Sequence, residues 1–205
     1  MMPVDPLILL AFFPAALALN LTPGADMMFC FGQGLRYGPR AALLADAGIA
    51  AGAMVHVTVA GLGLDAAIAA LPWAFDVIRW VGVAYLLWLA VGALRAGPIA
   101  ASGRVTVHAF RDAFVVNLTN PKVILFVLAF IPQFIDPSRG VLAQFVIFGA
   151  VLSLGGLAVN GAVGVFAGGM GRRPARSPGF ARVLGYVSAG VFAGLAVRLA
   201  VLQRS

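Results

Sequence analysis

Long apolar stretches separated by short polar connectors dominate the chain and set the first expectation for its fold. A helix needs about 20 apolar residues to cross the hydrocarbon core of a bilayer. Six stretches approach or exceed that length, at 7–31, 41–70, 73–94, 113–135, 141–168 and 183–202. The pattern therefore predicts an all-α, polytopic membrane protein of six transmembrane helices, with the lipid bilayer as its solvent.

The first apolar stretch is expected to stay in the membrane rather than to be removed as a secretory signal. Ala16-Leu17-Ala18 has the small residues that are typical of a cleavage site, but residues 1–6 contain no Lys or Arg. A secretory signal begins with a basic region. We therefore interpret this stretch as a retained transmembrane helix.

The composition agrees with this pattern and argues against a water-soluble fold. Hydrophobic residues make up 62% of the chain and charged residues 10%, whereas soluble domains carry roughly 25% charged residues. Cys30 is the single cysteine, which excludes disulfides within the chain, paired-thiol redox motifs and cysteine-based zinc sites. We expect no cofactor and no bound metal.

The basic residues lie mainly on one side of the predicted spans and so predict the orientation of the chain. The formal net charge is +7, and the cytoplasmic loops of membrane proteins carry an excess of Lys and Arg. Nine arginines lie beside the first, third and fifth connections, namely Arg36, Arg40, Arg95, Arg104, Arg111, Arg172, Arg173, Arg176 and Arg182. These connections are expected in the cytoplasm and both termini on the outer side. Because the surplus has this topological explanation, we expect no nucleic-acid partner.

A short motif occurs twice, in the first and in the fourth predicted span. The two copies read NLTPGAD at 20–26 and NLTNPK at 117–122, three spans apart. An odd number of spans reverses the direction of the second half, which is the arrangement of an inverted-topology repeat; a chance match of two tripeptides is the alternative. We expect one membrane domain made of two three-helix repeats and a cytoplasmic linker. Their bounds are 1–205 for the domain, 1–98 and 109–205 for the repeats, and 99–108 for the linker.

Each copy of the motif is expected to break its helix inside the membrane. Proline has no backbone N–H and clashes with the preceding helical turn, and Pro23-Gly24 and Asn120-Pro121 lie within apolar stretches. Irregular backbone at that depth is tolerated where it is buried in protein or lines a water-filled cavity, so both breaks are expected to face inward. The helix N-terminus after each break has a partial positive charge that would attract a carboxylate. A purely structural kink is the alternative.

Ionisable residues inside the predicted spans are candidates for a binding site, because a charge at a helix centre costs about 2.5–3.5 kcal/mol. Asp26 and Lys122 end the two motif copies, so they are expected to approach each other, as a structural pair or with one of them contacting a solute. Asp46 either lies at the cytoplasmic interface or points into the bundle, where it would bind an ammonium group or a coupled proton. His56 either titrates near neutral pH or packs through a hydrogen bond. The full set of candidate binding or coupling residues is Asn20, Pro23, Gly24, Asp26, Asp46, His56, Asn117, Asn120, Pro121 and Lys122.

Pairs of glycines four residues apart predict close contacts between helices. Gly48 and Gly52 lie in the second predicted span, and Gly190 and Gly194 lie in the sixth. Small residues let two membrane helices approach closely. Asn160, in the fifth span, is expected to hydrogen-bond between helices in the same way.

Four segments together resemble the LysE/RhtB family over essentially the whole chain. They are TPG at 22–24, GIAAGAMVH at 48–56, YLLWLAVGALR at 85–95 and VNLTNPKVILFVLAFIPQF at 116–134. The last of these is the most specific. The resemblance implies a bacterial inner-membrane exporter of amino acids or their derivatives, such as lysine, threonine, homoserine or leucine, driven by the proton gradient.

The resemblance also implies a set of functional residues and partners. Partners would be the amino acid or derivative, protons and the lipid bilayer, with both termini in the periplasm; a homo-oligomer is compatible with the sequence. Two positions depart from the family pattern, since Ala25 stands where a second proline is frequent and Asp46 where an apolar residue is usual. The motif residues carried over by position are Pro23, Gly24, Asp26, Gly48, Gly52, His56, Asn117, Asn120, Pro121, Lys122, Pro132, Gln133 and Phe134.

Our working hypothesis is a secondary transporter, an antiporter that binds a zwitterionic amino acid between the two halves. Its carboxylate would lie near the helix breaks and Lys122, and its ammonium near Asp26 or Asp46. An exporter of a metal cation or another small solute, and a membrane subunit that does not itself transport, are the alternatives. Neither an HExxH nor a GxSxG motif is present, so we expect no enzyme and no catalytic residues.

Overall fold

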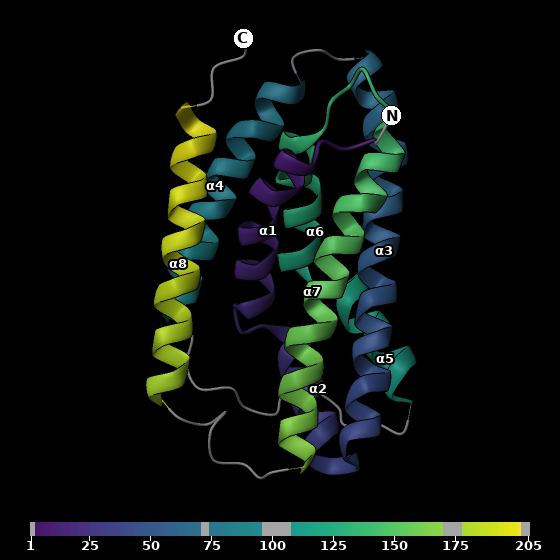
Figure 1. Cartoon of the computed structure of the whole chain (residues 1–205), viewed down its shortest axis with the longest axis vertical. Coiled ribbons are helices and arrows are strands. Elements are labelled where there is room, and N and C mark those ends of the chain that lie inside the picture. Colours follow the sequence, from purple (N-terminus) through teal and green to yellow (C-terminus); the bar gives the residue numbers. More distant parts are fainter. Residues whose placement is uncertain (1–2, 71–73, 96–107, 170–177, 202–205) are drawn as a thin grey trace.

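The protein is built from helices throughout the part of the chain that the structure describes. The computed structural model describes residues 3–70, 74–95, 108–169 and 178–201. The helices pack side by side along the long axis of the molecule (Figure 1). The predicted all-α class is therefore confirmed. Most of the predicted linker at 99–108 lies outside the described residues.

The first apolar stretch forms two helices with a break at the TPG motif. Helix α1 (Pro6–Leu21) begins at Asp5, whose side chain accepts a hydrogen bond from the backbone N–H of Leu7 at 2.8 Å. It ends before Pro23, and α2 (Ala25–Tyr37) follows at an angle of 53°. Gly38, with φ +85°, ends α2 in a conformation that favours glycine.

The fourth apolar stretch is broken in the same way. Helix α5 (Ala109–Leu118) ends at the motif, and α6 (Pro121–Ala129) begins directly after Asn120, which caps it. A short 3₁₀ helix, η1 (Ile131–Phe134), continues α6. The two segments meet at 53°, the same angle as in the first break. Both predicted helix breaks are confirmed.

Four unbroken helices complete the bundle. They are α3 (Pro39–Ala70), α4 (Ala74–Arg95), α7 (Val141–Gly169) and α8 (Pro178–Val201). Among the described residues, α3 and α7 contain stretches long and apolar enough to cross a membrane, and each bent pair qualifies as one more span. Some side chains of α4 and α8 lie outside the residues that the structure describes. The total of six membrane spans therefore remains a prediction.

The packing pairs the helices that the proposed repeat makes equivalent. Helix α3 packs along α7, and α4 packs along α8. Some of the cross contacts also match, since α1 packs on α7 as α5 does on α3, and α2 packs on α7 as α6 does on α3. Others have no comparable counterpart in the other half, since α1 also packs on α8 and α6 on α4. The beginning of α1 and the end of α8 lie toward the same end of the bundle (Figure 1). The matching contacts are what two related halves would give, and the inverted repeat remains a prediction that they support.

Glycines allow the closest of these contacts, but only one of the two predicted pairs takes part. A Cβ atom on Gly48 would collide with the backbone carbonyl of Phe110, and one on Gly52 would lie 2.7 Å from Oδ1 of Asn117. These glycines therefore let α3 approach α5. The prediction for Gly190 and Gly194 is wrong within the described part of the chain, where a Cβ on either would have no neighbour within 4 Å.

The contact between α4 and α8 is made at another glycine, Gly185. A Cβ atom on Gly185 would collide with the backbone carbonyl of Ala93 on α4. Spacing alone did not find this position, because a glycine pair looks the same in sequence on a helix face toward a neighbour and on a face away from one. A glycine allows a close contact only when it lies on the helix face that packs against a neighbouring helix.

A cluster of phenylalanines holds the broken helices together on one side of the breaks. Phe12 of α1 is fully buried and lies in ring contact with Phe126 of α6, Phe134 of η1 and Phe148 of α7. The ring centroids of Phe12 and Phe148 are 4.8 Å apart. Such contacts stabilise by burial and by ring geometry, so the cluster fixes the position of α1 against α6.

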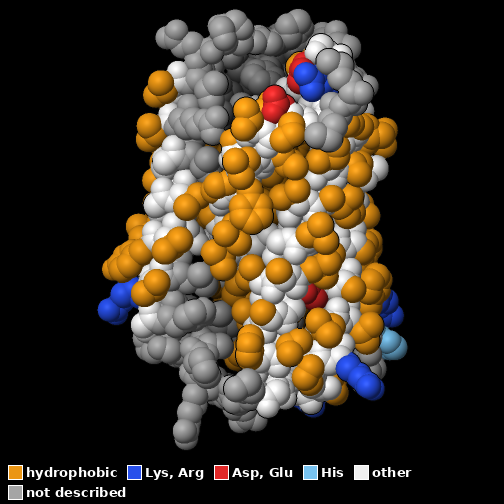
Figure 2. All heavy atoms as spheres, in the orientation of Figure 1, with side chains coloured by type: hydrophobic (Ala, Val, Ile, Leu, Met, Phe, Trp, Pro, Cys, Tyr) orange, Lys and Arg blue, Asp and Glu red, His pale blue; other side chains and the backbone are white. Residues whose placement is uncertain are grey.

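The outer surface is apolar along the middle of the bundle. Hydrophobic side chains cover most of the visible face, and charged side chains gather mainly toward the two ends (Figure 2). Trp80 and Trp88 on α4 expose more than half of their surface. A soluble protein rarely exposes so large an apolar area. This surface is suited to contact with lipid chains.

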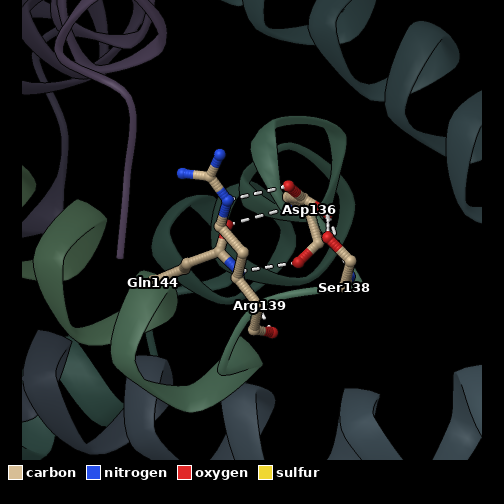
Figure 3. Close-up of polar contacts among 4 residues, drawn as sticks. All are labelled: Asp136, Ser138, Arg139 and Gln144. Carbon is tan, nitrogen blue, oxygen red and sulfur yellow. Dashed lines mark hydrogen bonds and ion pairs between the residues drawn. The ribbon is translucent and has the colours of Figure 1, made fainter. Parts of the chain in front are cut away.

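The connection from η1 to α7 is closed by the buried side chain of Gln144 (Figure 3). Its Oε1 accepts a hydrogen bond from the backbone N–H of Asp136 at 2.9 Å, and its Nε2 donates to the carbonyl of Asp136 at 2.8 Å. The Asp136 side chain accepts from the hydroxyl and the backbone N–H of Ser138 and pairs with Arg139. The hydrogen bonds from Ser138 lower the pKa of Asp136.

We expect Gln144→Leu to destabilise the protein. The change keeps a buried side chain of similar size but leaves the backbone N–H of Asp136 without its partner, which costs about 1–3 kcal/mol. The carbonyl of Asp136 still accepts a hydrogen bond from the backbone N–H of Arg139 at 3.1 Å. Ser138→Ala removes hydrogen bonds at an exposed position and should change the stability much less. The melting temperatures of the purified variants in detergent test this, and equal melting temperatures would contradict it.

Candidate functional site

The two helix breaks are joined by a hydrogen-bonded lysine. The ammonium of Lys122, in the first turn of α6, donates to the backbone carbonyls of Leu19 and Thr22, each at 2.9 Å. Those carbonyls lie at the end of α1, where the break leaves them without the usual partner in the next helical turn. The second broken helix thus supplies the donor that the first broken helix lacks.

The position of Lys122 is also favourable electrostatically. The C-terminal end of a helix has a partial negative charge, and the ammonium lies against that end of α1. Its Nζ atom would be 3.1 Å from a Cβ atom on Gly24, so the glycine of the TPG motif leaves the room in which the lysine lies. Gly24 and Lys122 therefore lie beside each other at the first break.

Asp26 lies on the other side of the first break, in the first turn of α2. Its carboxylate is buried and accepts a hydrogen bond from Nδ2 of Asn117 at 2.9 Å. The N-terminal end of a helix favours a negative charge, and Gly24 at this end offers no side chain to cap it. Asp26 and Lys122 are close enough to interact electrostatically, as predicted. The hydrogen bonds described above join each of them to neutral groups, Asp26 to the Asn117 amide and Lys122 to two backbone carbonyls.

Asn117 connects this carboxylate to α3. Its side chain donates to Asp26, and its backbone carbonyl lies 3.2 Å from Nε2 of His56. His56 is partly buried, and its ring lies against the carbonyl of Asn117 at the end of α5, which also accepts from the backbone N–H of Asn120 at 2.9 Å. A basic side chain therefore lies next to each break, Lys122 at the first and His56 at the second. This contact supports the packing interpretation of His56, and the alternative interpretation stays a prediction.

Asn120 and Pro121 occupy different surroundings, although they are neighbours. Asn120 is buried, and its Oδ1 accepts from the backbone N–H of Lys122 at 3.0 Å, which caps α6. Pro121 is exposed, so the proline is not buried in protein, and its expected position on a water-filled cavity stays a prediction. It tolerates this position because the first residue of a helix needs no N–H partner.

Tyr85 of α4 belongs to this site, although it was not among the candidates predicted from the sequence. Its hydroxyl donates to the backbone carbonyl of Lys122 at 2.6 Å. The available signal was a single tyrosine in the apolar segment 85–95, because a buried phenol needs a hydrogen-bond partner. This contact ties the start of α6 to α4.

Asn20 of α1 faces α7 rather than the lysine. Its Nδ2 donates to the backbone carbonyl of Leu152 at 3.0 Å. A Cβ atom on Gly155 would lie 2.7 Å from Nδ2 of Asn20, and one on Gly156 would lie 3.5 Å from its Oδ1. The two glycines make room for the asparagine, so the first copy of the motif is anchored on the face of α7 on which α1 packs.

Asp46 of α3 points into the bundle and is only 1% exposed. A Cβ atom on Gly161 of α7 would lie 2.8 Å from its Oδ2, and the side chain of Asn160 is a polar neighbour. Neither carboxylate oxygen has a hydrogen bond of good geometry from the described residues. Of the two interpretations of Asp46, the interfacial one is wrong.

The site therefore combines one ammonium, two carboxylates and several amides at the junction of the two breaks. Pro23 and Gly24 are partly buried beside it. Within the described residues, no group of three His, Cys, Asp or Glu side chains could hold a metal ion. The chemistry that these side chains offer is the binding of a small solute with charges of both signs.

Comparisons with known proteins agree on one family. Residues 17–203 match the family model described as LysE type translocator. An uncharacterized membrane protein of Vibrio cholerae is 38% identical over 147 residues, which cover 68% of this chain and 71% of that protein. No solved structure is significantly similar to the chain.

Two further relatives are named for a transported compound. A homoserine/homoserine lactone efflux protein of Salmonella typhimurium is 34% identical over 149 residues, 68% of this chain and 70% of that protein. A leucine efflux protein of Klebsiella pneumoniae is 35% identical over 133 residues, 62% of this chain and 63% of that protein.

Proposed function

Because the chain belongs to the family of LysE type translocators, we propose that it exports amino acids or their derivatives across a bacterial inner membrane. Members of the family are transporters and not enzymes. Relatives of similar length are named as efflux proteins for homoserine, homoserine lactone and leucine. These names support a small zwitterionic or cationic solute as the class of substrate.

The observation that carries the proposal is the hydrogen bonding of Lys122 to the end of α1. Its bonds to Leu19 and Thr22 join the two broken helices at their breaks. Binding sites of transporters with inverted repeats lie at such junctions, where half-helix ends meet the solute. In this proposal, the substrate carboxylate binds near Lys122 and the uncapped start of α2.

The same junction gives the proposed transport its mechanism. Repeats at 1–98 and 109–205 would move against each other around the breaks and so expose the site first to the cytoplasm and then to the periplasm. The buried acids Asp26 and Asp46 are groups that can take up a proton, which supports proton antiport as the driving force. In this orientation both termini lie in the periplasm.

The test is efflux of labelled leucine and homoserine from loaded cells, followed by flux in proteoliposomes that contain the purified chain alone. We expect outward flux that depends on an imposed proton gradient and stops when a protonophore is added. Flux in proteoliposomes would exclude a subunit without its own transport path. Protection of cells from cadmium without amino-acid flux would contradict the proposal in favour of a metal exporter.

Asp26→Asn should reduce efflux by about tenfold or more, because a hydrogen bond to a charged acceptor is worth about 1 kcal/mol or more above one to a neutral acceptor. The asparagine keeps the shape of the side chain but removes the negative charge at the start of α2. Asp136→Asn is the matched control, because this acid lies in the exposed connection before α7 and should leave flux unchanged. Equal flux in the wild type and Asp26→Asn, at equal amounts in the membrane, would sink the role given to Asp26.

A further inference from the structure

Asp46 is a buried carboxylate whose charge the described residues do not balance. Of the buried acids, Asp26 has the side-chain amide of Asn117 as a donor and Lys122 nearby. Asp46 has the side-chain amide of Asn160 and the backbone N–H of Gly161 as polar neighbours, but neither makes a hydrogen bond of good geometry to its carboxylate. Leaving an ionised carboxylate inside a membrane protein without compensation is costly. A proton or a cation from outside these side chains therefore neutralises Asp46.

The charges around Asp46 itself give the same result. The basic groups Lys122 and His56 act on the other acid, Asp26, and the ammonium of Lys122 is already bonded to two carbonyls of α1. The ionisable groups that act on Asp46 from the packed helices are Asp26 and Cys30 of α2, and neither supplies a positive charge. In the described part of the chain, Asp46 therefore lacks a positively charged partner.

The polar groups beside Asp46 lead back to the first break. Asn160 lies one residue before Gly161, against which the Asp46 carboxylate packs. One helical turn further along α7, a Cβ atom on Gly156 would lie 3.5 Å from Oδ1 of Asn20 and 3.9 Å from Nδ2 of Asn160. Asn20, Asn160 and Asp46 thus form a row of polar side chains along a glycine-rich face of α7.

We propose that Asp46, with Asn160 beside it, binds the ammonium group of the transported solute. The inference rests on the proposed function and deepens it, because it chooses between the two acids that the sequence left open. A primary ammonium has three donors, which suit one carboxylate and a neighbouring amide oxygen. A divalent metal ion would need more ligands than this row offers.

The first test compares two substrates that differ in the ammonium group. Leucine and 2-hydroxy-4-methylpentanoate have the same carbon skeleton, but the second carries a hydroxyl in place of the ammonium. In proteoliposomes, Asp46→Asn should raise the KM for leucine by about tenfold or more and leave the KM for the hydroxy acid unchanged. An equal rise for both substrates, or no change for either, would overturn the proposal.

A second variant displaces the carboxylate and keeps its charge. In Gly161→Ala the new methyl group would lie 2.8 Å from Oδ2 of Asp46, so the carboxylate must turn away. We expect the KM for leucine to rise in this variant as well, while Asp136→Asn, in the exposed connection, behaves as the wild type. A wild-type KM in Gly161→Ala would contradict the position given to the ammonium.

The last test measures binding without transport. It therefore distinguishes a failure of the ammonium site at Asp46 from a failure of the proposed export function. Methylammonium chloride should raise the melting temperature of the purified wild type above that in equal sodium chloride, and this gain should be absent in Asp46→Asn. Equal stabilisation by sodium would assign the site to an alkali cation, and no stabilisation by either would mean a protonated Asp46; both results overturn the inference. Wild-type protein that binds methylammonium but moves no amino acid would instead refute the proposed function.

Discussion

Lys122→Met is expected to abolish efflux and to lower the stability of the protein. The variant loses both hydrogen bonds from the ammonium to Leu19 and Thr22, and a hydrogen bond to a charged group is worth about 1.5–3 kcal/mol. It also leaves the carbonyls at the end of α1 without a donor. Because the side chain is only partly buried, we expect a total loss of about 3 kcal/mol. Efflux from loaded cells and the melting temperature in detergent measure the two effects.

A double variant separates the structural from the functional part of this effect. In Lys122→Met the buried carboxylate of Asp26 loses the positive charge nearby. Adding Asp26→Asn removes that carboxylate as well, so the double variant lacks one charge of each sign and has no unbalanced charge at this position. We expect the double variant to melt at a higher temperature than Lys122→Met and still to export nothing. Recovery of efflux along with stability would show that Lys122 acts only as a structural cation.

The helix breaks were predictable from sequence because their cause is local. Proline removes a backbone donor wherever it stands within a helix, but a proline alone is not sufficient, since Pro14 lies inside the continuous α1. In NLTPGAD and NLTNPK the proline stands next to a glycine or an asparagine, residues that favour helix ends, and this combination indicated the two bends before any packing was known. The approach of Asp26 and Lys122 followed from placing the two motif copies face to face. What could not be predicted is that the lysine bonds to carbonyls of α1, because sequence does not show which backbone groups a break leaves open.

The burial of Asp46 was undecided for a different reason. Helix α3 is apolar nearly all the way round, so the periodicity of its sequence does not identify the face that packs against α7. The choice between interface and interior depends on the neighbour, Gly161, whose missing side chain gives the carboxylate its place. Helix α8 likewise has no polar face. Its sequence therefore did not show that Gly185 faces α4 whereas Gly190 and Gly194 do not.

Tyr85 shows the same limit for a contact between distant elements. Its hydroxyl bonds to the carbonyl of Lys122, 37 residues along the chain, and the position of α4 against α6 is fixed by packing over the whole bundle. A buried tyrosine signals that some polar partner exists. It does not signal which one.

Gly34→Ala is expected to give the largest loss of stability among single methyl additions. A Cβ atom at Gly34 of α2 would collide with the backbone carbonyl of Gly164 on α7. Gly164 is itself confined, since a Cβ there would lie 2.6 Å from Cβ of Ala42 on α3. Both obstacles belong to backbone or to a short side chain, so neither can move aside without shifting a helix.

The sign of this effect is set by two opposing contributions. Alanine is a better helix former than glycine by up to about 1 kcal/mol, while overpacking of a close contact costs about 1–3 kcal/mol or more. For Gly34 the collision outweighs the gain, and we expect a lower melting temperature and poor recovery from the membrane. Gly63→Ala, on α3 with no atom of the described residues within 4 Å of the new methyl group, keeps only the gain and should melt at the same or a higher temperature. If both variants melted alike, the approach of α2, α3 and α7 would be looser than the structure shows, and the positions of Asp26 and Asp46 on these helices would have to be reconsidered with it.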